Sequence, residues 1–167
     1  MSADLVTVEL DTTMGMITVE LNREKAPLTV DNFVQYAKDN HYNGTIFHRV
    51  INGFMIQCGG MDAKMLEKSG KAPIKNEGLN GLKNDKYTLA MARTNDPNSA
   101  TAQFFINTAN NDFLNGAPGK AGYAVFGKVI AGTEVVDKIS KVKTGNAGHH
   151  SDVPVEAIAI KTATVID

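Results

Sequence analysis

Arg49 is the residue of this sequence whose type and setting point most directly to chemistry. It lies in residues 47–60, where two largely apolar segments flank an Asn52-Gly53 turn. Arginine remains protonated at physiological pH and presents several N–H donors in a planar fork, so it can stabilise a partner without releasing a proton. On a strand, His48 and Arg49 would point to opposite faces. These residues alone leave two interpretations open, a site built around Arg49 and a core hairpin with an exposed arginine.

The second segment of this hairpin, residues 54–58, alternates two sets of side chains. Phe54, Ile56 and Cys58 would share one face of a strand, whereas Met55 and Gln57 would share the other face.

Residues 99–107 show the same alternation, because Gln103 and Phe105 alternate with Phe104. A strand would place Gln103 and Phe105 on one face. Taken alone, this segment fits a buried aromatic strand as well as it fits a binding site.

The residues before the hairpin predict a pair of strands followed by a helix. Apolar and polar residues alternate over residues 6–10 and 17–21, with Gly15 available for the turn between them. After Ala26-Pro27, apolar residues recur at the spacing of a helix with one buried stripe, and Pro is well tolerated in a first helical turn. Asn43-Gly44 supplies turn chemistry at the end of this segment.

Short strands dominate the rest of the chain, separated by loops rich in Gly and Asn. We expect strands at residues 47–51, 54–58, 88–91, 104–107, 125–130 and 157–165, and a second helix over residues 133–140. The pattern predicts a mainly β fold, a closed antiparallel β-barrel of about eight strands capped by two α-helices. The 167 residues suit one domain over residues 1–167.

Composition excludes several classes of protein. The formal net charge of -1 argues against a nucleic-acid partner, which normally requires a basic excess. No apolar run approaches the roughly 20 residues that span a bilayer, and residues 1–5 lack the features of a secretory signal, so we expect no membrane association and a cytoplasmic location. Cys58 is the only cysteine, which rules out an internal disulfide and suits a reducing compartment. We expect a monomer.

Three further features have plainer interpretations. His149-His150 lacks an evident partner at metal-ligand spacing, so a solvated loop is favoured over a metal site. Cys58 lies in an apolar strand without an evident base, which favours a buried hydrophobic residue over a nucleophile. Asn43-Gly44-Thr45 matches a glycosylation sequon, but a chain without a secretory signal would not meet the modifying enzymes.

Residues 47–60 and 99–107 together resemble the two signature segments of the cyclophilins, a family of peptidyl-prolyl cis/trans isomerases. The resemblance extends to Ala26-Pro27, Met91-Ala92-Arg93 and residues 111–114, 123–129 and 135–139, in the family's order over nearly the whole chain. The sequence is most similar to the cytoplasmic bacterial members. The resemblance implies an enzyme that accelerates rotation about Xaa-Pro bonds in peptides and unfolded chains, without a cofactor or metal.

The resemblance also implies a role for particular residues. The family's catalytic arginine falls on Arg49, and the histidine beside it falls on His48. The backbone that pairs with a bound peptide falls on Ala92, Arg93 and Thr94. The residues of the pocket that holds the substrate fall on Phe54, Met55, Gln57, Gln103, Phe105 and Leu114.

Three positions depart from many relatives of this family. Arg93 replaces an asparagine of many eukaryotic relatives, where the contact is mainly through the backbone. Phe113 replaces a tryptophan that is important for tight cyclosporin binding, and because Phe has no N–H donor we expect cyclosporin to bind weakly. Tyr123 replaces a pocket histidine of some relatives, which keeps an aromatic wall and changes its polar tip.

Three other functions compete with the isomerase. A non-catalytic module could grip proline peptides with the same pocket, but pure binding would need only the apolar residues and not Arg49. A folding chaperone could carry isomerase activity as an incidental property. A hydrolase is the least favoured, because no Ser/His/Asp or Cys/His set emerges at readable positions.

Overall fold

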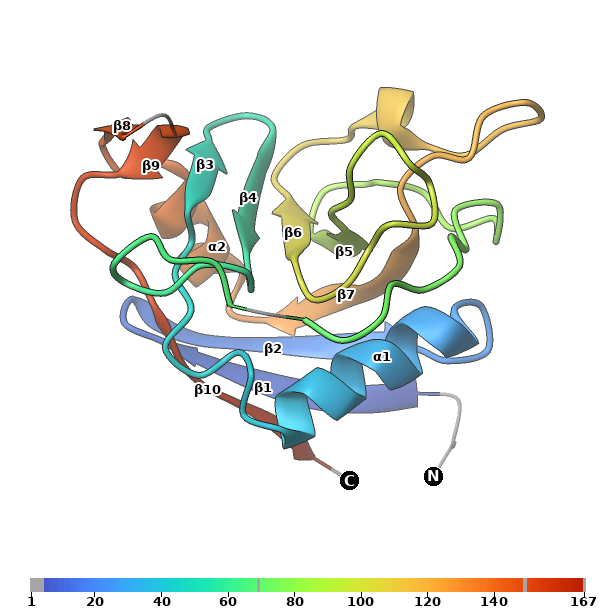
Figure 1. Cartoon of the computed structure of the whole chain (residues 1–167), viewed down its shortest axis with the longest axis horizontal. Coiled ribbons are helices and arrows are strands. Elements are labelled where there is room, and N and C mark those ends of the chain that lie inside the picture. Colours follow the sequence, from blue (N-terminus) through green and yellow to red (C-terminus); the bar gives the residue numbers. More distant parts are fainter. Residues whose placement is uncertain (1–4, 69, 149, 167) are drawn as a thin grey trace.

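An antiparallel sheet of eight strands organises the chain in the computed structural model, which describes residues 5–68, 70–148 and 150–166 (Figure 1). The strands pair in the order β10-β1-β2-β7-β5-β6-β4-β3. The strands predicted from alternation are all present, although β3 and β10 begin later than expected. Their bounds are β1 Leu5–Thr12, β2 Gly15–Asn22, β3 Arg49–Ile51, β4 Met55–Cys58, β5 Thr88–Met91, β6 Phe104–Asn107, β7 Val125–Ala131 and β10 Ile160–Ile166.

The sheet is an open half-barrel, so the closed barrel predicted from the sequence is wrong. Its two edges are β3 and β10. The chain before β3 meets the chain before β10 in a short contact, in which the Phe47 N–H donates to the Ile158 carbonyl over 2.9 Å. β9 (His150–Pro154) then lies beside β3 (Figure 1). Among the described residues, no continuous ladder therefore joins the two edges.

Two α-helices pack against the sheet, as the sequence predicted. α1 (Pro27–Lys38) lies against β2 and β10, and it buries a stripe that includes Val30, Phe33 and Ala37. α2 (Thr133–Ser140) has the predicted bounds and packs against β2, β3 and β4. The sheet covers the apolar stripe of each helix. This packing supplies most of the stability of helices as short as these.

A distant carboxylate caps the first turn of α1. Glu77 accepts hydrogen bonds from the Thr29 N–H and hydroxyl, each over 2.7 Å, and from the Leu28 N–H over 3.3 Å. These N–H groups have no partner within the helix, and a negative charge at this end also interacts favourably with the helix dipole. Glu77 therefore anchors the long loop between β4 and β5 to the helix.

The side chains of β4 and β6 divide between two apolar clusters on opposite faces of the sheet. Ile56, Cys58, Phe104 and Ile106 enter the main core beneath α1. The alternate residues form a smaller cluster on the other face, which consists of Met55, Ala90, Phe105, Leu114 and Val125. The period of two along a strand thus assigns one set of residues to the core and leaves the other for the surface of the site.

The sequence did not predict three short elements. These are the hairpin of β8 (Thr144–Ala147) and β9, and the 3₁₀ helix η1 (Asp112–Leu114). Each is too short to show a period. No helix in the described ranges is both long and apolar enough to cross a bilayer.

His48 is a buried histidine on the segment that leads into β3. Its side chain is 7% exposed, and its Nδ1 has no hydrogen-bond partner among the described residues. Burial lowers the pKa of His48 to about 4, and the charges of His150 and Arg49 act in the same direction. The imidazole is therefore neutral in the folded protein at neutral pH.

The pKa of His48 predicts how stability depends on pH. Between its usual value of about 6.5 and the folded value of about 4, the unfolded chain binds a proton at this site and the folded protein does not, so stability falls as the pH falls through this window. Between pH 7 and pH 4, the free energy of unfolding of the wild type should fall by about 3 kcal/mol more than that of His48→Gln. Urea unfolding at several pH values measures the difference, and parallel pH curves for the two proteins would contradict it.

Candidate active site

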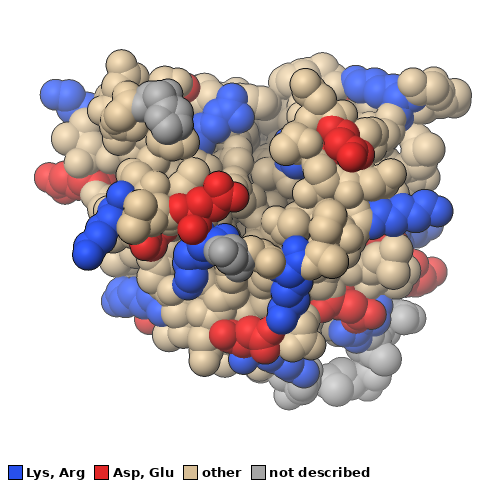
Figure 2. Space-filling model, in the orientation of Figure 1, with Lys and Arg blue, Asp and Glu red and all other residues tan. Residues whose placement is uncertain are grey.

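A small cavity gathers nine of the residues to which the sequence assigned a role. Its volume is about 120 Å³, and it lies between the β3–β4 hairpin on one side and β6, η1 and the segment before β7 on the other. Figure 2, in the orientation of Figure 1, shows the surface hollowed between these two parts of the molecule. The residues that line the cavity are Arg49, Phe54, Met55, Gln57, Ala92, Arg93, Phe105, Leu114 and Tyr123.

Strand pairing aligns three of these residues in one row across the sheet. Arg49 on β3 lies opposite Gln57 on β4, and Gln57 lies opposite Phe105 on β6. Directly opposed residues of antiparallel strands project from the same face, with their Cβ atoms about 4.5–5.5 Å apart. The register therefore places a guanidinium, an amide and an aromatic ring side by side. We call this arrangement the Arg49 row.

Arg49 keeps its donors available. Its side chain is exposed, and within the described ranges it makes no hydrogen bond or ion pair. Because the guanidinium is always protonated, it offers hydrogen bonds at any pH at which the protein is folded.

Arg93, the second arginine of the cavity, is engaged within the chain. Its Nε and Nη2 donate to the Gly122 carbonyl over 3.2 Å and 2.9 Å, and its Nη1 donates to the Thr94 carbonyl over 2.9 Å. The guanidinium also lies over the ring of Tyr123, 4.4 Å from its centroid. Tyr123 in turn meets Phe105 edge to face, with 5.8 Å between ring centroids. Arg93 therefore acts as the outer support of an aromatic wall.

Gln103 belongs to a neighbouring cavity and holds Gln57. The second cavity, of about 330 Å³, shares Gln57, Ala92 and Arg93 with the first. Gln57 Nε2 donates to Gln103 Oε1 over 2.9 Å, which fixes the Gln57 amide. Gly60 makes room for this pair, because a Cβ at that position would lie 2.3 Å from the Gln103 side chain.

Two other predicted residues do not line the cavity. His48, on the segment that leads into β3, is buried whereas Arg49 is exposed, in agreement with the expectation that the two side chains point to opposite faces. Phe113 lies on η1 with 62% of its surface exposed, and its ring stacks on Phe54 with 5.7 Å between centroids. Phe113 therefore extends the aromatic surface beyond the rim of the cavity.

The backbone expected to pair with a peptide is partly engaged within the chain. The Ala92 N–H donates to the Gln103 carbonyl over 3.0 Å, and the Thr94 N–H donates to Ser99 Oγ over 2.9 Å. A peptide paired with this segment would therefore have to use other groups, such as the peptide group of Arg93.

Sequence patterns did not predict a set of four hydrogen-bonded asparagines next to the cavity walls, which we call the asparagine network. It consists of Asn84, Asn107, Asn111 and Asn115. Asn107 Nδ2 donates to Asn84 Oδ1 over 3.0 Å, and Asn111 Nδ2 donates to Asn107 Oδ1 over 2.7 Å. Asn115 Oδ1 accepts from the Asn84 N–H over 2.6 Å. Periodicity cannot reveal such residues, because polar side chains in loops are usually solvated.

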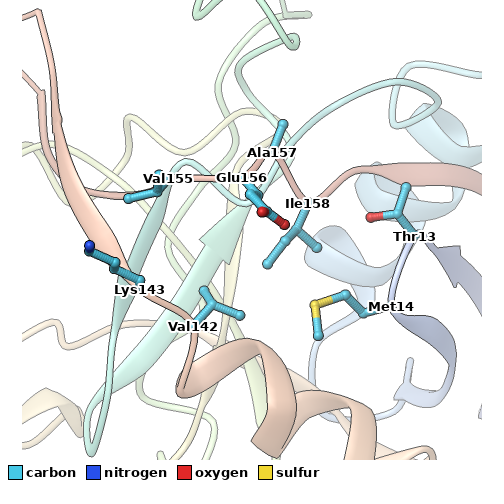
Figure 3. Close-up of a pocket in the computed structure, with 8 residues that line it drawn as sticks. All are labelled: Thr13, Met14, Val142, Lys143, Val155, Glu156, Ala157 and Ile158. Atoms are coloured by element: carbon cyan, nitrogen blue, oxygen red, sulfur yellow. The ribbon is translucent and has the colours of Figure 1, made fainter.

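A larger cavity lies elsewhere and shares no lining residue with the first. It has a volume of about 530 Å³ and lies between the β1–β2 turn, the end of α2 and the segment before β10 (Figure 3). Met14, Val142 and Ile158 form much of its lining, together with the charged residues Lys143 and Glu156. It lacks the aligned donors and aromatic walls of the Arg49 cavity, which we therefore retain as the candidate site.

The described residues contain no group of three or more His, Cys, Asp or Glu side chains that could hold a metal. His149, one of the pair weighed above, lies outside the described residues. Cys58 is buried, and burial raises the pKa of its thiol well above the usual value, so its thiolate is disfavoured.

Comparison with known proteins identifies the family. The model of the family described as cyclophilin type peptidyl-prolyl cis-trans isomerase matches residues 5–165. The chain is 57% identical to "Peptidyl-prolyl cis-trans isomerase cyp18" of Streptomyces antibioticus, over 96% of this chain and 98% of that protein. It is 54% identical to "Peptidyl-prolyl cis-trans isomerase B" of Escherichia coli, over 95% of this chain and 98% of that protein.

A solved structure agrees with these relatives. The crystal structure of a Cryptosporidium parvum cyclophilin type peptidyl-prolyl cis-trans isomerase, in the presence of the dipeptide Ala-Pro, superposes with a TM-score of 0.83. It is 29% identical, and the match covers 96% of this chain and 99% of that one. The chain therefore belongs to the cyclophilin type peptidyl-prolyl cis-trans isomerases, and it is an enzyme of that class.

Proposed function

We propose that this enzyme accelerates rotation about Xaa-Pro bonds in peptides and unfolded chains, with Arg49 as the catalytic residue and the adjoining cavity as the proline site. The observation that carries the proposal is the Arg49 row, which sets a donor beside an apolar recess. The Cryptosporidium relative, crystallised in the presence of Ala-Pro, supports a proline-containing ligand.

The reaction requires a lower rotational barrier and no covalent chemistry. Resonance in the peptide bond makes rotation cost about 18–20 kcal/mol. For an Xaa-Pro bond the two isomers differ by only about 0.5–1 kcal/mol, but they exchange over tens to hundreds of seconds. A catalyst therefore needs groups that bind the twisted bond more tightly than either planar isomer.

Arg49 can supply such a group. In the twisted transition state the prolyl nitrogen loses resonance, becomes pyramidal and regains a lone pair. A hydrogen bond from Arg49 to that nitrogen would then be stronger than in the planar ground state, as catalysis demands. The guanidinium needs no change of protonation to act, and its several donors allow it to follow the rotating group.

The apolar walls would hold the proline ring while the preceding carbonyl swings. Met55, Phe105 and Leu114 belong to the small apolar cluster that forms the floor of the cavity. Phe54 closes one side. Gln57 Nε2 uses one hydrogen to bond Gln103. Gln57 could then direct its Oε1 toward Arg49, or its second Nε2 hydrogen toward the substrate.

We also propose that the chain acts as one domain, monomeric and in the cytoplasm. The buried, unreactive Cys58 suits a reducing compartment, since it neither needs nor offers a disulfide partner.

A binding module without activity and a chaperone are the alternatives, and Arg49 favours neither because both could work with the apolar cavity alone. An isomerisation assay on the purified protein separates the enzyme from the binding module, and an aggregation assay with proline-free clients tests for a chaperone.

Arg49→Ala should lower kcat/KM by roughly 10²- to 10³-fold, as the loss of one preorganised donor does in other enzymes. Because Arg49 is exposed and makes no hydrogen bond within the described residues, the fold should be unchanged. Exchange NMR on an Ala-Pro peptide measures the rates, with Lys161→Ala as a control for loss of a surface cation. Full activity in a folded Arg49→Ala protein would defeat the assignment.

Phe105→Leu should raise KM, because a smaller, differently shaped side chain holds the proline ring less well. Phe104→Leu is the matched control, since Phe104 is the next residue on β6 but faces the main core. Both variants should lose about 1 kcal/mol or more of stability. The proposal requires that only Phe105→Leu raises KM, so equal KM values for the two variants would count against it.

Cyclosporin should bind weakly, and Phe113→Trp should bind it up to about tenfold more tightly. The indole N–H would restore one hydrogen bond, which contributes about 0.5–1.5 kcal/mol net. The exposed position of Phe113 allows the larger ring without repacking. Calorimetric titration measures both affinities, and a nanomolar dissociation constant for the wild type would contradict the prediction.

A further inference from the structure

Three walls of the Arg49 cavity come from residues that lie outside the strands. Phe54 lies in the turn between β3 and β4, Leu114 ends η1, and Tyr123 precedes β7. Loop segments are generally more mobile than the strands they connect. The Phe54 carbonyl accepts a hydrogen bond from the Thr108 N–H, directly after β6, over 2.9 Å, so the sheet fixes part of one wall and other contacts must fix the rest.

Asn111 joins two of these walls directly. Its Nδ2 donates to the Phe54 carbonyl over 2.8 Å, and its own carbonyl accepts from the Leu114 N–H over 3.0 Å. The same Nδ2 donates to Asn107 Oδ1 over 2.7 Å, which ties both walls to the end of β6. One residue thus links the β3–β4 turn, η1 and the sheet.

The asparagine network extends the same support to the third wall. Asn107 donates to Asn84 Oδ1, and Asn84 Nδ2 reaches the Tyr123 carbonyl over 3.4 Å. The Tyr123 N–H donates to the Leu114 carbonyl over 2.9 Å, which closes the circuit. Asn111 is only 4% exposed, so water cannot replace its hydrogen bonds without rearrangement.

We propose that Asn111 is a positioning residue, which sets the separation of Phe54 and Leu114 and so the width of the pocket that grips the proline ring. This inference rests on the proposed function of the cavity. Asn111 does not line the cavity: its side chain reaches the wall at Phe54, its backbone carbonyl reaches the wall at Leu114, and it would act on the substrate through these two walls alone.

The expected kinetic effect follows from that role. A loosened pocket holds the proline ring less well in the ground state and in the transition state, and uniform binding of this kind appears in KM. A displacement of about 1 Å can cost about 100-fold in rate. Loss of Asn111 should therefore lower kcat/KM about 10- to 100-fold, with most of the change in KM, whereas loss of Arg49 should act mainly on kcat.

The test compares Asn111→Ala with a matched control, Thr45→Val. Thr45 is buried and donates its hydroxyl to the Tyr42 carbonyl over 2.7 Å, so Thr45→Val also removes a buried hydrogen bond but does not touch the cavity. Steady-state isomerisation of an Ala-Pro peptide, well below the melting temperatures of both variants, gives kcat and KM. KM values that match in the two variants would overturn the proposal.

Asn111→Asp gives a second readout, which remains usable if Asn111→Ala is too unstable to assay. The substitution is isosteric, but the ionised carboxylate has no donor for Phe54 or Asn107, whereas the protonated form has one. Burial raises the pKa of a carboxyl group, so lowering the pH from 8 to 5 should restore part of the lost kcat/KM relative to wild type. His48 stays neutral over this range, because its pKa is about 4. If the kcat/KM of Asn111→Asp divided by that of the wild type does not change with pH, the proposal is also overturned.

Wild type and Arg49→Ala are measured in the same series, which separates the two hypotheses. If the wild type is inactive, or if Arg49→Ala is fully active, the proposed function of the cavity fails. If both behave as proposed while Asn111→Ala resembles Thr45→Val, the cavity is the site and Asn111 does not position it.

Discussion

The register of three paired strands is the constraint on which the proposed site depends. Arg49, Gln57 and Phe105 share a face only because β3, β4 and β6 pair with those residues directly opposed. A slip of one residue in either pairing would turn a member of this row into the core and bring a core residue such as Phe104 to the surface. The same register that buries Ile56 and Ile106 opposite each other therefore also assembles the site.

The side chains of β4 and β6 point to two faces of the sheet, and only one of these faces contributes to the proposed site. The main core holds the large side chains beneath α1, whereas the small cluster around Met55 supplies only the floor of the cavity. Phe54 and Tyr123 pack against this cluster but are only partly buried. Hydrogen bonds of the asparagine network join the same loops, and each is more effective where it is shielded from water.

Local patterns in the sequence predicted the elements better than their assembly. The bounds of β5, β6 and α2 were predicted correctly, because β5 and β6 are short apolar runs next to loops rich in Gly and Asn, and α2 buries one regular stripe of residues. Closure of the barrel was not predictable in this way, since it depends on where β9 settles beside β3. All nine residues that line the cavity were named from the family resemblance. The role of Asn111 was not, because a buried asparagine in a loop has the same sequence signature as a solvated one.

The contrast between the two arginines of the cavity bears on how catalysis would begin. The Arg93 guanidinium already donates hydrogen bonds to two carbonyls, so it can support Tyr123 but has few donors available for a substrate. Arg49 is exposed, and in water its hydrogen bonds to a weak acceptor such as the prolyl nitrogen would compete poorly with solvent. A bound peptide that covers Arg49 would expel this water and strengthen every interaction with the guanidinium. Binding of the proline ring in the apolar recess would therefore precede, and make possible, the electrostatic contribution of Arg49.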